Sequence, residues 1–578
     1  MLLAAGGTAA APARDSSRAA LSEAIKVDQV GYLPSRPKLA MVTDTRATGA
    51  FRVRRARDGA EVAGGALGPP QSDPDTGDTV RLADFSALGE SGTFYLEVAG
   101  LGTSDEFDVA PDVYARAFLL VSRAFYGQRC GMAVDLAPLH PGYSYPACHV
   151  AGTPNPDALL HASAGAGGTV DGSGGWHDAG DYGKYVVNSG ITTGELLWAY
   201  ELFPERVGAV SLQIPESGNG VPDLLDEARW NLRWMLKMQD ADGGVWHKLT
   251  SERFGGFVMP HRDDGGPRYV IGTGSAPFKS SCATGDFAAV MALAARVFRP
   301  FDAEFASAAL AAAERAWSWL ARNPNVVFRN CCGVVTGEYG DGNCADERLW
   351  AAAELFRTTG SPVYNAYFTA SFSAGGAVLS EGAPAWPEVR SLALLSYALS
   401  RQPSTDEAVR SRIRADAVAA GALLVARTRA NPYRISLRPT DYVWGSNGVV
   451  ANYGVALVLV NALQPDPALL DAAAENLHYL LGRNTFALSW VTQLGDRPFR
   501  HPHHRPSGGD ANAEPWPGLL SGGPNRYGGD PVIDALPAAP PARRYRDDQG
   551  SYASNENAIN WNAPLVFLLA SLLPDPAR

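Results

Sequence analysis

The sequence predicts a mainly α-helical chain in which a ring of paired helices follows a small β-sandwich. Apolar residues recur with helical spacing in about a dozen segments after Pro111. Short β-prone runs alternate with turn-rich clusters between Ile25 and Ala110. The helical region lacks the strand–helix alternation that builds a parallel sheet. We therefore expect an all-β domain over residues 25–110 and a helical domain over residues 111–578.

The N-terminal β region consists of short runs separated by turns such as Gly68-Pro69-Pro70. This spacing is typical of an antiparallel sandwich. The region holds few candidate catalytic groups, so we expect it to pack against its neighbour. The predicted strands lie near residues 24–30, 38–43, 51–54, 79–82, 93–98 and 106–109.

The helical segments are joined by several long loops rich in glycine, proline and asparagine. If the helices pair and close into a ring, these loops gather at one end and form the functional site. The loops over 151–173 and 514–546 are candidate walls of that site. The predicted helices lie near residues 112–127, 186–203, 221–239, 281–298, 302–322, 345–359, 361–373, 387–402, 406–429, 447–463, 467–482 and 556–573.

The charge balance is acidic, with 60 Asp and Glu against 49 Lys and Arg in 578 residues. This balance argues against nucleic acid and anionic membranes as partners. No apolar run is expected to span a membrane. Residues 1–24 are interpreted as a leader or a disordered start. Their Ala-rich beginning has no preceding Lys or Arg, so the export-signal pattern is incomplete, and a secreted or periplasmic location is an expectation only.

Two aspartates, Asp178 and Asp181, lie three positions apart in the glycine-rich stretch 174–185. Glycines allow the backbone to approach a ligand closely. The two carboxylates could then share a water molecule or a cation. The alternative is that Asp181 only caps the helix that follows.

Two cysteines and two histidines precede these aspartates and form a complete donor set for tetrahedral zinc. A zinc ion with four protein ligands would be structural, because no position stays open for a substrate water. The alternatives are a disulfide between the two cysteines or two buried thiols. The set is Cys130, Cys148, His149 and His177.

Two acidic loops carry hard oxygen donors of the kind that calcium prefers. For both loops the alternative is a capped helix start with solvated acids. The first loop contains Glu216, Asn219, Asp223 and Asp226. The second loop contains Asp341, Asp346 and Glu347. Pairing stays open for four further cysteines, Cys282, Cys331, Cys332 and Cys344.

Three stretches near the C-terminus complete the candidate residues. Trp444 lies on a glycine-rich loop and could stack on a sugar ring. The alternative, which is more common for tryptophan, is packing in the core or at its rim. His503 and Arg505 lie two apart in an extended segment and would face the same way. Glu556 lies among aromatic residues at a predicted helix start. Partial burial would favour its neutral acid form, and the alternative is a carboxylate that complements the helix dipole.

Five stretches, spread over nearly the whole chain after Ile25, belong together as one pattern: 27–34 (VDQVGYLP), 175–181 (GWHDAGD), 339–352, 489–505 and 545–563. In these stretches the sequence resembles glycoside hydrolase family nine, the inverting cellulases, and its subgroup with an N-terminal immunoglobulin-like domain.

This resemblance implies an (α/α)6 barrel that hydrolyses β-1,4-glucosidic bonds of cellulose or related β-glucans with inversion. It implies that Asp181 is the general base, that Asp178 helps to hold the attacking water, and that Glu556 is the general acid. His503 and Arg505 would bind sugar hydroxyls. Asp547, grouped with the substrate-binding residues, would support the loop of the acid.

The resemblance also implies structural zinc at the cysteine–histidine set, structural calcium at the Glu216–Asp226 loop and no organic cofactor. We expect a monomer that binds a β-1,4-glucan or cello-oligosaccharide and neither nucleic acid nor membrane. Three alternatives stay open. These are exo-action (including β-glucosidase or exo-glucosaminidase activity), a carbohydrate-binding protein without catalysis, and a zinc hydrolase that uses His501, His503 and His504.

Overall fold

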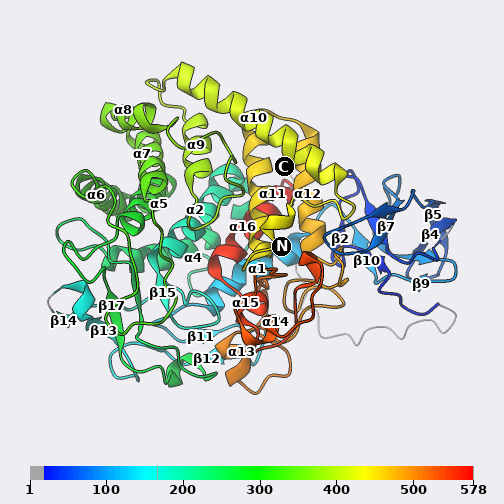
Figure 1. Ribbon diagram of the computed structural model, residues 1–578, viewed down its shortest axis with the longest axis horizontal. Helices are drawn as coiled ribbons and strands as arrows, with labels where there is room; N and C mark the ends of the chain where they lie inside the picture. Colours follow the sequence, from blue (N-terminus) through cyan, green and yellow to red (C-terminus); the bar gives the residue numbers. More distant parts are fainter. Residues whose placement is uncertain (1–18, 48, 166, 577–578) are drawn as a thin grey trace.

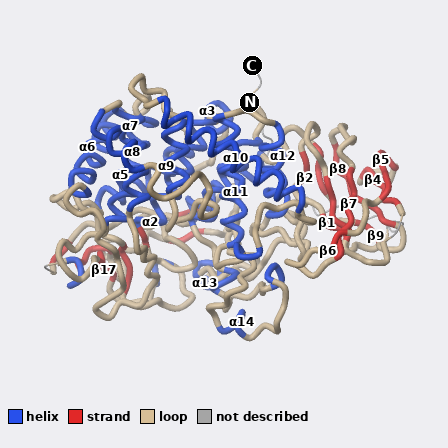
Figure 2. Tube along the Cα trace, turned by 45° about the horizontal axis from the view of Figure 1, so that its top comes forward, coloured by secondary structure: helices blue, strands red, loops and turns tan. Residues whose placement is uncertain are grey.

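The computed structural model describes residues 19–47, 49–165 and 167–576. Most of the expected leader, residues 1–18, therefore lies outside the described residues. Strands gather in a large group at one side of the molecule and in a smaller group at the opposite, loop-rich side, and helices fill much of the rest (Figures 1 and 2).

The N-terminal strands form two facing sheets, one in the order β1-β3-β7-β6 and the other in the order β2-β10-β8-β4-β5, with β9 beside β8. Along β4 the side chains alternate, so that Phe51 and Val53 are buried while Ala50 and Arg52 are exposed. The predicted all-β sandwich is thus confirmed. The strands are β1 (Ile25–Lys26), β2 (Gly31–Tyr32), β3 (Leu39–Val42), β4 (Ala50–Arg55), β5 (Glu61–Ala66), β6 (Gln71–Ser72), β7 (Thr79–Asp84), β8 (Gly92–Val98), β9 (Gly102–Thr103) and β10 (Phe107–Val109).

The long helices form an inner ring and an outer layer. Within residues 19–576, six inner helices contact one another in a closed ring, in the order α2, α5, α7, α9, α11, α16 and back to α2. This closed ring confirms the predicted (α/α)6 barrel. The inner helices are α2 (Val186–Leu202), α5 (Ser281–Phe298), α7 (Ala345–Thr359), α9 (Arg390–Ala398), α11 (Ser446–Leu463) and α16 (Ile559–Leu572).

Each inner helix packs most extensively against one outer helix: α1 on α16, α4 on α2, α6 on α5, α8 on α7, α10 on α9 and α12 on α11. The outer helices are α1 (Ala115–Gly127), α4 (Asp223–Lys237), α6 (Ala303–Leu320), α8 (Pro362–Ser371), α10 (Glu407–Ala430) and α12 (Pro467–Leu480). Short helices α3 (Pro204–Gly208), α13 (Arg505–Gly509), α14 (Pro531–Asp534) and α15 (Tyr552–Asn555) lie in the connections.

The two layers differ in burial because only the outer helices face solvent. α5 is buried at nearly every position, and its N-terminus is capped by the Ser280 side chain. α10 is buried along one stripe that includes Ile413, Ala417 and Leu424, and Asp406 caps its first turn.

Two of the described inner helices, α5 and α11, are long and apolar enough by length and composition to cross a membrane. The expectation that no run reaches this length is therefore wrong. Both helices are mostly buried inside the barrel, and their composition fits a position between the ring interior and the outer layer.

A second sheet, which was not predicted, lies at the loop-rich end of the barrel (Figure 2). Its strand order is β14-β13-β17-β16-β15. The sheet replaces part of the plain loop expected over 151–173. The strands are β13 (Asp157–Leu160), β14 (Gly168–Thr169), β15 (Lys184–Tyr185), β16 (Lys248–Ser251) and β17 (Arg268–Ile271), and a separate hairpin pairs β11 (Val134–Asp135) with β12 (Ser144–Tyr145).

A disulfide joins Cys282 in α5 to Cys344 at the start of α7. It ties the long α6–α7 connection to the inner ring. It also answers half of the pairing question that the sequence left open.

The sandwich contacts the barrel through buried polar side chains. Asp28 Oδ2 lies 2.8 Å from His478 Nδ1 in α12. The Gln29 amide group donates to the Ala487 carbonyl at 2.9 Å and accepts from the Arg497 amide at 2.8 Å. The sandwich therefore holds the segment that runs from the end of α12 toward His503.

Candidate active site

The glycine-rich turn at 174–185 enters the barrel just before α2. The Asp178 amide donates to the Gly183 carbonyl at 2.9 Å and closes the turn. The Gly183 amide in turn donates to Asp181 Oδ1. A Cβ atom at Gly180 would lie 1.8 Å from the His503 carbonyl oxygen, so only glycine fits there. The turn therefore packs directly against the segment that carries His503.

Glu556 reaches the same turn from the other end of the chain. The Gly180 amide lies 3.3 Å from Glu556 Oε1 and donates to it. Glu556 itself is extended, with φ −74° and ψ 154°, between α15 and α16. The predicted helix start at residue 556 is therefore wrong by three residues, because α16 begins at Ile559. The alternative role of complementing a helix dipole loses its basis.

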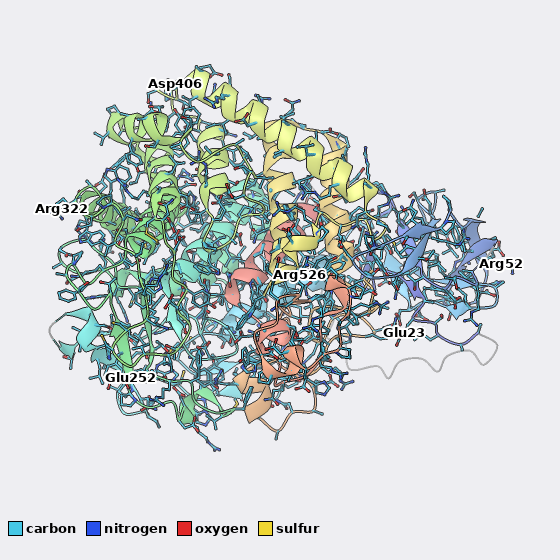
Figure 3. All side chains as sticks on the ribbon, viewed as in Figure 1. Glu23, Arg52, Glu252, Arg322, Asp406 and Arg526 are labelled. Atoms are coloured by element: carbon cyan, nitrogen blue, oxygen red, sulfur yellow. A yellow bond between two sulfur atoms is a disulfide. The ribbon has the colours of Figure 1, made fainter. Side chains whose placement is uncertain are left out.

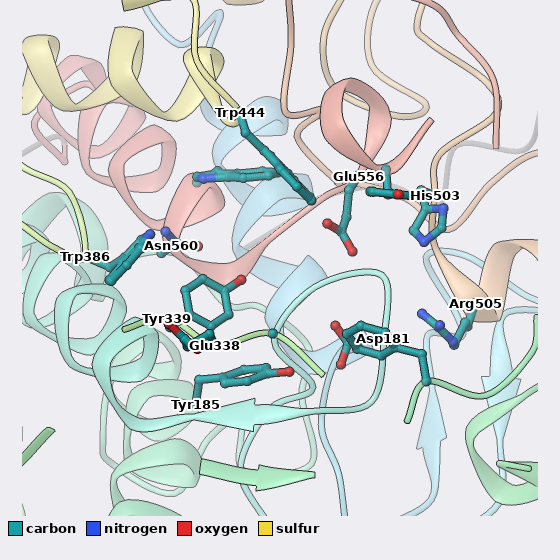
Figure 4. Close-up of a pocket in the computed structure, with 14 residues that line it drawn as sticks. Asp181, Tyr185, Glu338, Tyr339, Trp386, Trp444, His503, Arg505, Glu556 and Asn560 are labelled. Atoms are coloured by element: carbon teal, nitrogen blue, oxygen red, sulfur yellow. The ribbon is translucent and has the colours of Figure 1, made fainter. Parts of the chain in front are cut away.

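Asp181 and Glu556 both border one cavity of about 700 Å³. In Figure 4 the Glu556 and Asp181 carboxyl groups approach this cavity from opposite sides and point toward each other. The described residues that line it are Asp181, Tyr185, Phe254, Gly337, Glu338, Tyr339, Trp386, Trp444, His503, Arg505, Tyr552, Glu556, Asn560 and Trp561.

Burial dominates the titration of the two carboxyl groups. It raises the pKa of Glu556 well above its ordinary value, and the nearby Asp181 carboxylate adds to this rise while Arg505 opposes it. Burial also raises the pKa of Asp181, and here Arg505 and the Gly183 amide act in the opposite direction. Glu556 is thereby favoured as a proton donor, and positive charge beside Asp181 favours its ionised form.

Asp178 lies behind Asp181 and is fully buried. Its carboxylate accepts hydrogen bonds from Asn188 Nδ2 at 2.9 and 3.1 Å and from the Tyr339 hydroxyl at 2.9 Å. It is not among the residues that line the cavity. That Asp178 helps to hold the attacking water stays a prediction, and its hydrogen bonds tie it to Asn188 and Tyr339.

His503 and Arg505 both line the cavity, as their spacing predicts. His503 Nδ1 lies 2.7 Å from the Gln549 carbonyl oxygen, which leaves Nε2 available to a ligand. The Arg505 guanidinium donates to the carbonyl oxygens of Gly180 and Gly255, each at 3.0 Å. Arg505 therefore also holds the turn at 174–185.

Asp547 is not a lining residue. Its carboxylate accepts from the Arg500 and His501 amides, each at 2.8 Å, and from Asn555 Nδ2 at 2.9 Å. These bonds fix the residue just before Glu556, in keeping with a supporting role. The grouping of Asp547 with the substrate-binding residues stays a prediction.

Trp444 lines the cavity and remains 45% exposed. Its ring lies 5.6 Å from that of Tyr552. Six further aromatic residues line the cavity and received no site role from the sequence: Tyr185, Phe254, Tyr339, Trp386, Tyr552 and Trp561. An aromatic residue in a turn-rich loop, such as Trp386 between Pro384 and Pro387, was the available signal. Flat apolar side chains around two carboxyl groups suit a sugar chain.

The predicted zinc set converges. The ligand atoms of Cys130, Cys148, His149 and His177 all lie within 4.8 Å of one another, and all four residues are buried. The two cysteines are not joined in a disulfide. His149 Nε2 lies 3.2 Å from Asp263 Oδ2, as expected for a carboxylate that orients a histidine ligand. Two sulfur and two imidazole donors in a closed buried site fit zinc.

The first predicted calcium loop does not converge. Arg129 pairs with Glu216 at 2.9 Å, and Arg229 pairs with Asp226. Asp223 Oδ2 accepts a backbone amide at 2.7 Å. Arginine neighbours oppose a cation, so the structure gives no support to the calcium set Glu216, Asn219, Asp223 and Asp226.

The second acidic loop does converge. Ligand oxygens of Asp341, Asp346 and Glu347 lie within 4.8 Å of one another. Buried Asp286 lies close enough that its charge acts on this group. Both carboxylate oxygens of Asp286 and of Glu347 lack a hydrogen-bond donor among the described residues. Buried carboxylates without donors are expected where a hard cation binds.

The three histidines of the alternative zinc hydrolase do not form a ligand group among the described residues. His501 is largely exposed and lies 3.5 Å from Asp547. His504 Nδ1 lies 2.9 Å from the Ser507 hydroxyl. This arrangement gives the zinc-hydrolase alternative no support.

The sequence profile of "Glycosyl hydrolase family 9" matches residues 114–569, and that of "Cellulase N-terminal ig-like domain" matches residues 20–103. Endoglucanase D of Acetivibrio thermocellus is 38% identical over 95% of this chain and 83% of its own length. The xyloglucan-specific endo-β-1,4-glucanase BoGH9A of Bacteroides ovatus is 35% identical over 95% of this chain and 94% of its own.

Solved structures with the same fold include a Zn-binding triple mutant of GH family 9 endoglucanase J30, with a TM-score of 0.87 and 36% identity. The alignment covers 94% of this chain and all of that one. AaCel9A in complex with cellobiose-like isofagomine has a TM-score of 0.86 and 33% identity, over 95% of this chain and 99% of that one.

Proposed function

The chain belongs to glycosyl hydrolase family 9, and we propose that it cuts β-1,4-glucans at internal bonds with inversion at the anomeric carbon. As a member of this family it is a glycoside hydrolase of the cellulase type that cleaves β-1,4-glucans. The proposal adds the position of cleavage, the stereochemistry and the residues that act.

One observation carries the assignment of residues: Asp181 and Glu556 face each other across the aromatic-lined cavity (Figure 4). Inverting hydrolysis needs an acid on one side of the glycosidic bond and a base on the other, with room for one water molecule. In the proposed reaction Asp181 takes a proton from water, which attacks the anomeric carbon. Glu556 gives its proton to the leaving glycosidic oxygen.

The neighbouring groups prepare the two carboxyl groups for these roles. The raised pKa of Glu556 keeps its proton available near neutral pH. Arg505 stabilises the ionised form of Asp181 and, through the Gly180 carbonyl, the position of its turn. Asp178, held by Asn188 and Tyr339, orients the same turn from behind.

Aromatic side chains provide the binding surface of the proposed cleft. Trp444, Trp386 and Tyr552 offer flat faces on which glucose rings can stack. His503 Nε2 is the proposed hydrogen-bond partner of a sugar hydroxyl. A cello-oligosaccharide or an unbranched β-glucan chain is therefore the proposed substrate.

We further propose that zinc is bound by the four cysteine and histidine ligands and calcium by the Asp341–Glu347 cluster with Asp286. Both ions would be structural. Zinc would fix the residue directly before Asp178, and calcium would fix the start of α7. The disulfide between Cys282 and Cys344 favours an oxidising compartment, which supports a secreted or periplasmic location.

The test is the time course of products from soluble carboxymethylcellulose and from defined cello-oligosaccharides. Internal cleavage predicts a rapid fall in viscosity while few reducing ends have formed. Release of only glucose or cellobiose from the first time point would instead establish exo-action. Absence of hydrolysis on every β-1,4-glucan would contradict the proposal.

A further inference from the structure

Cys331 and Cys332 are adjacent in the sequence, and neither belongs to the disulfide described above. Their Sγ atoms lie 2.7 Å apart, which is much closer than two unbonded thiols approach. Cys332 is exposed and Cys331 is partly exposed. We propose that these two thiols form a vicinal disulfide, an oxidation site that fixes the loop on one wall of the substrate cavity.

The backbone brings the two sulfur atoms together. The Val334 amide donates to the Cys331 carbonyl at 3.1 Å and closes a four-residue turn. Both central residues of this turn have positive φ, 61° at Cys332 and 95° at Gly333. Such a turn is unusual for a cysteine. Here it places the Sγ atoms of neighbouring residues within reach of a bond.

The surroundings leave space for the sulfur atoms. A Cβ atom at Gly274 would lie 2.6 Å from Cys331 Sγ, so a glycine at that position is what admits the sulfur. The Val335 amide, next to the turn, donates to the Glu252 carbonyl at 2.8 Å. Glu252 lies at the loop-rich edge of the barrel in Figure 3. The pair is therefore accessible to a small oxidant.

The turn is coupled to the cavity by short contacts. The Asn330 amide donates to Glu338 Oε2 at 2.9 Å and closes the loop on itself. Lys248 Nζ donates to Asn330 Oδ1 at 2.8 Å and to the Gly337 carbonyl at 2.7 Å. The same ammonium lies 5.7 Å from the ring centre of Tyr185. Gly337, Glu338 and Tyr185 all line the cavity.

The oxidation balances with a small disulfide such as oxidised glutathione. The Cys332 thiolate attacks one glutathione sulfur, and one glutathione thiolate leaves with a proton. The Cys331 thiolate then attacks Cys332 Sγ and releases the second glutathione as its thiol. The two cysteines lose two electrons and two protons, and the glutathione disulfide gains them. Cys332 is the more exposed of the two and is therefore the first to react, and burial together with the neighbouring Cys332 raises the pKa of Cys331 to about 11.

Reduction of the Cys331–Cys332 disulfide should be easy. Adjacent Cα atoms are only about 3.8 Å apart, whereas the Cα atoms of ordinary disulfides are about 4.4–6.8 Å apart. A bond formed under this constraint is reduced more readily than an unconstrained one. A mild reductant should therefore open Cys331–Cys332 before it opens Cys282–Cys344.

Mass spectrometry tests the bond itself. The full-length protein is treated with oxidised glutathione, denatured, alkylated with iodoacetamide without reductant, and digested after Arg and Glu. Cleavage after Arg329 and Glu338 releases the peptide 330–338, which separates the pair from Cys344. The proposal expects this peptide without alkyl groups and two hydrogens lighter than the dithiol. Two alkyl groups, or a cross-link to another peptide, would overturn it.

Hydrolysis of a cello-oligosaccharide tests the coupling, which rests on the function proposed above, whereas the bond does not. We expect mild reduction to raise KM about twofold or more. A variant with both Cys331→Ser and Cys332→Ser, given the same treatment, controls for opening of Cys282–Cys344 and should not respond. An equal response in that variant, or an unchanged KM in the natural protein, would overturn the coupling. If no β-glucan is hydrolysed, the proposed function fails and the mass result still decides the bond.

Discussion

The amide nitrogen of Gly180 donates a hydrogen bond to Glu556 Oε1 at 3.3 Å across a separation of 376 positions in the chain. The bond attaches the turn of Asp181 to the opposite carboxyl group. The two groups that we propose as base and acid therefore cannot move independently.

Replacing Glu556 with Gln should lower kcat on cello-oligosaccharides by about 10²–10⁴-fold, because the amide cannot donate the required proton. The thermal midpoint should change little, since the side chain keeps its size and can still accept from Gly180. The matched control is Glu338→Gln, a carboxyl group of the same cavity with no assigned proton transfer. Near-normal kcat in the Glu556 variant would remove the residue from its role.

Asp181→Asn should abolish the activation of water. The natural protein, in which Asp181 activates the water, should release the α-anomer first. Direct attack by water on a β-linked sugar inverts the configuration. Proton NMR during the first minutes of hydrolysis, before mutarotation, resolves the two anomers. An initial β-anomer would mean retention and would assign the two carboxyl groups differently.

Arg505 should affect the position, on the pH axis, of both the acidic and the basic limb of the pH–activity profile. Activity needs ionised Asp181 and protonated Glu556, and the guanidinium lowers the pKa of both groups. Arg505→Leu should therefore shift both limbs of log(kcat/KM) to higher pH by about one unit. Arg505→Lys keeps the charge and should leave the limbs nearly in place. A fall in amplitude without any shift in the leucine variant would show that Arg505 acts only on geometry.

Zinc should be present in stoichiometric amount and should stabilise the fold. Cys148→Ser should remove the metal and lower the thermal midpoint, because a closed site contributes its binding free energy to folding. Inductively coupled plasma mass spectrometry measures the ion, and calorimetry measures the midpoint. Cys332→Ser, which changes an exposed thiol, is the control that should keep full zinc content.

Calcium should raise the thermal midpoint through the second acidic loop and not the first. Saturation at a hundred times Kd corresponds to about 2.7 kcal/mol. Glu347→Gln should remove the calcium response, whereas Glu216→Gln should leave it intact because Glu216 pairs with Arg129. The reverse pattern would restore the ligand set predicted from the sequence.

The sequence predicted the helices well because their burial repeats over many turns. The apolar spacing in 281–298, for example, coincides with α5. The sheet at the loop-rich end escaped prediction because strands of two to four residues, such as β15, are too short to show alternation. β5, with the sequence EVAGGA, was missed because it has no apolar face of its own.

Within the site, local motifs pointed to the residues that we propose as base and acid, and contacts between distant segments show how each one is held. Asp181 and Glu556 were recognisable from glycine and aromatic neighbours. Asp178 does not line the cavity. Its hydrogen-bond partners are Asn188 and Tyr339, and no local sequence pattern connects these two residues to it. The Glu216 loop looked like a calcium loop because its arginine partner, Arg129, lies 87 positions away.

The side-chain amide of Gln29 bridges the Ala487 carbonyl and the Arg497 amide, just upstream of the strand-like stretch that ends at His503. A domain that shares no wall with the cleft thus serves as a brace for one of its edges. A barrel expressed alone would keep every residue that we propose to act on the sugar. Its segment around His503 would nevertheless be less firmly held, and its activity should fall most on substrates whose binding depends on His503.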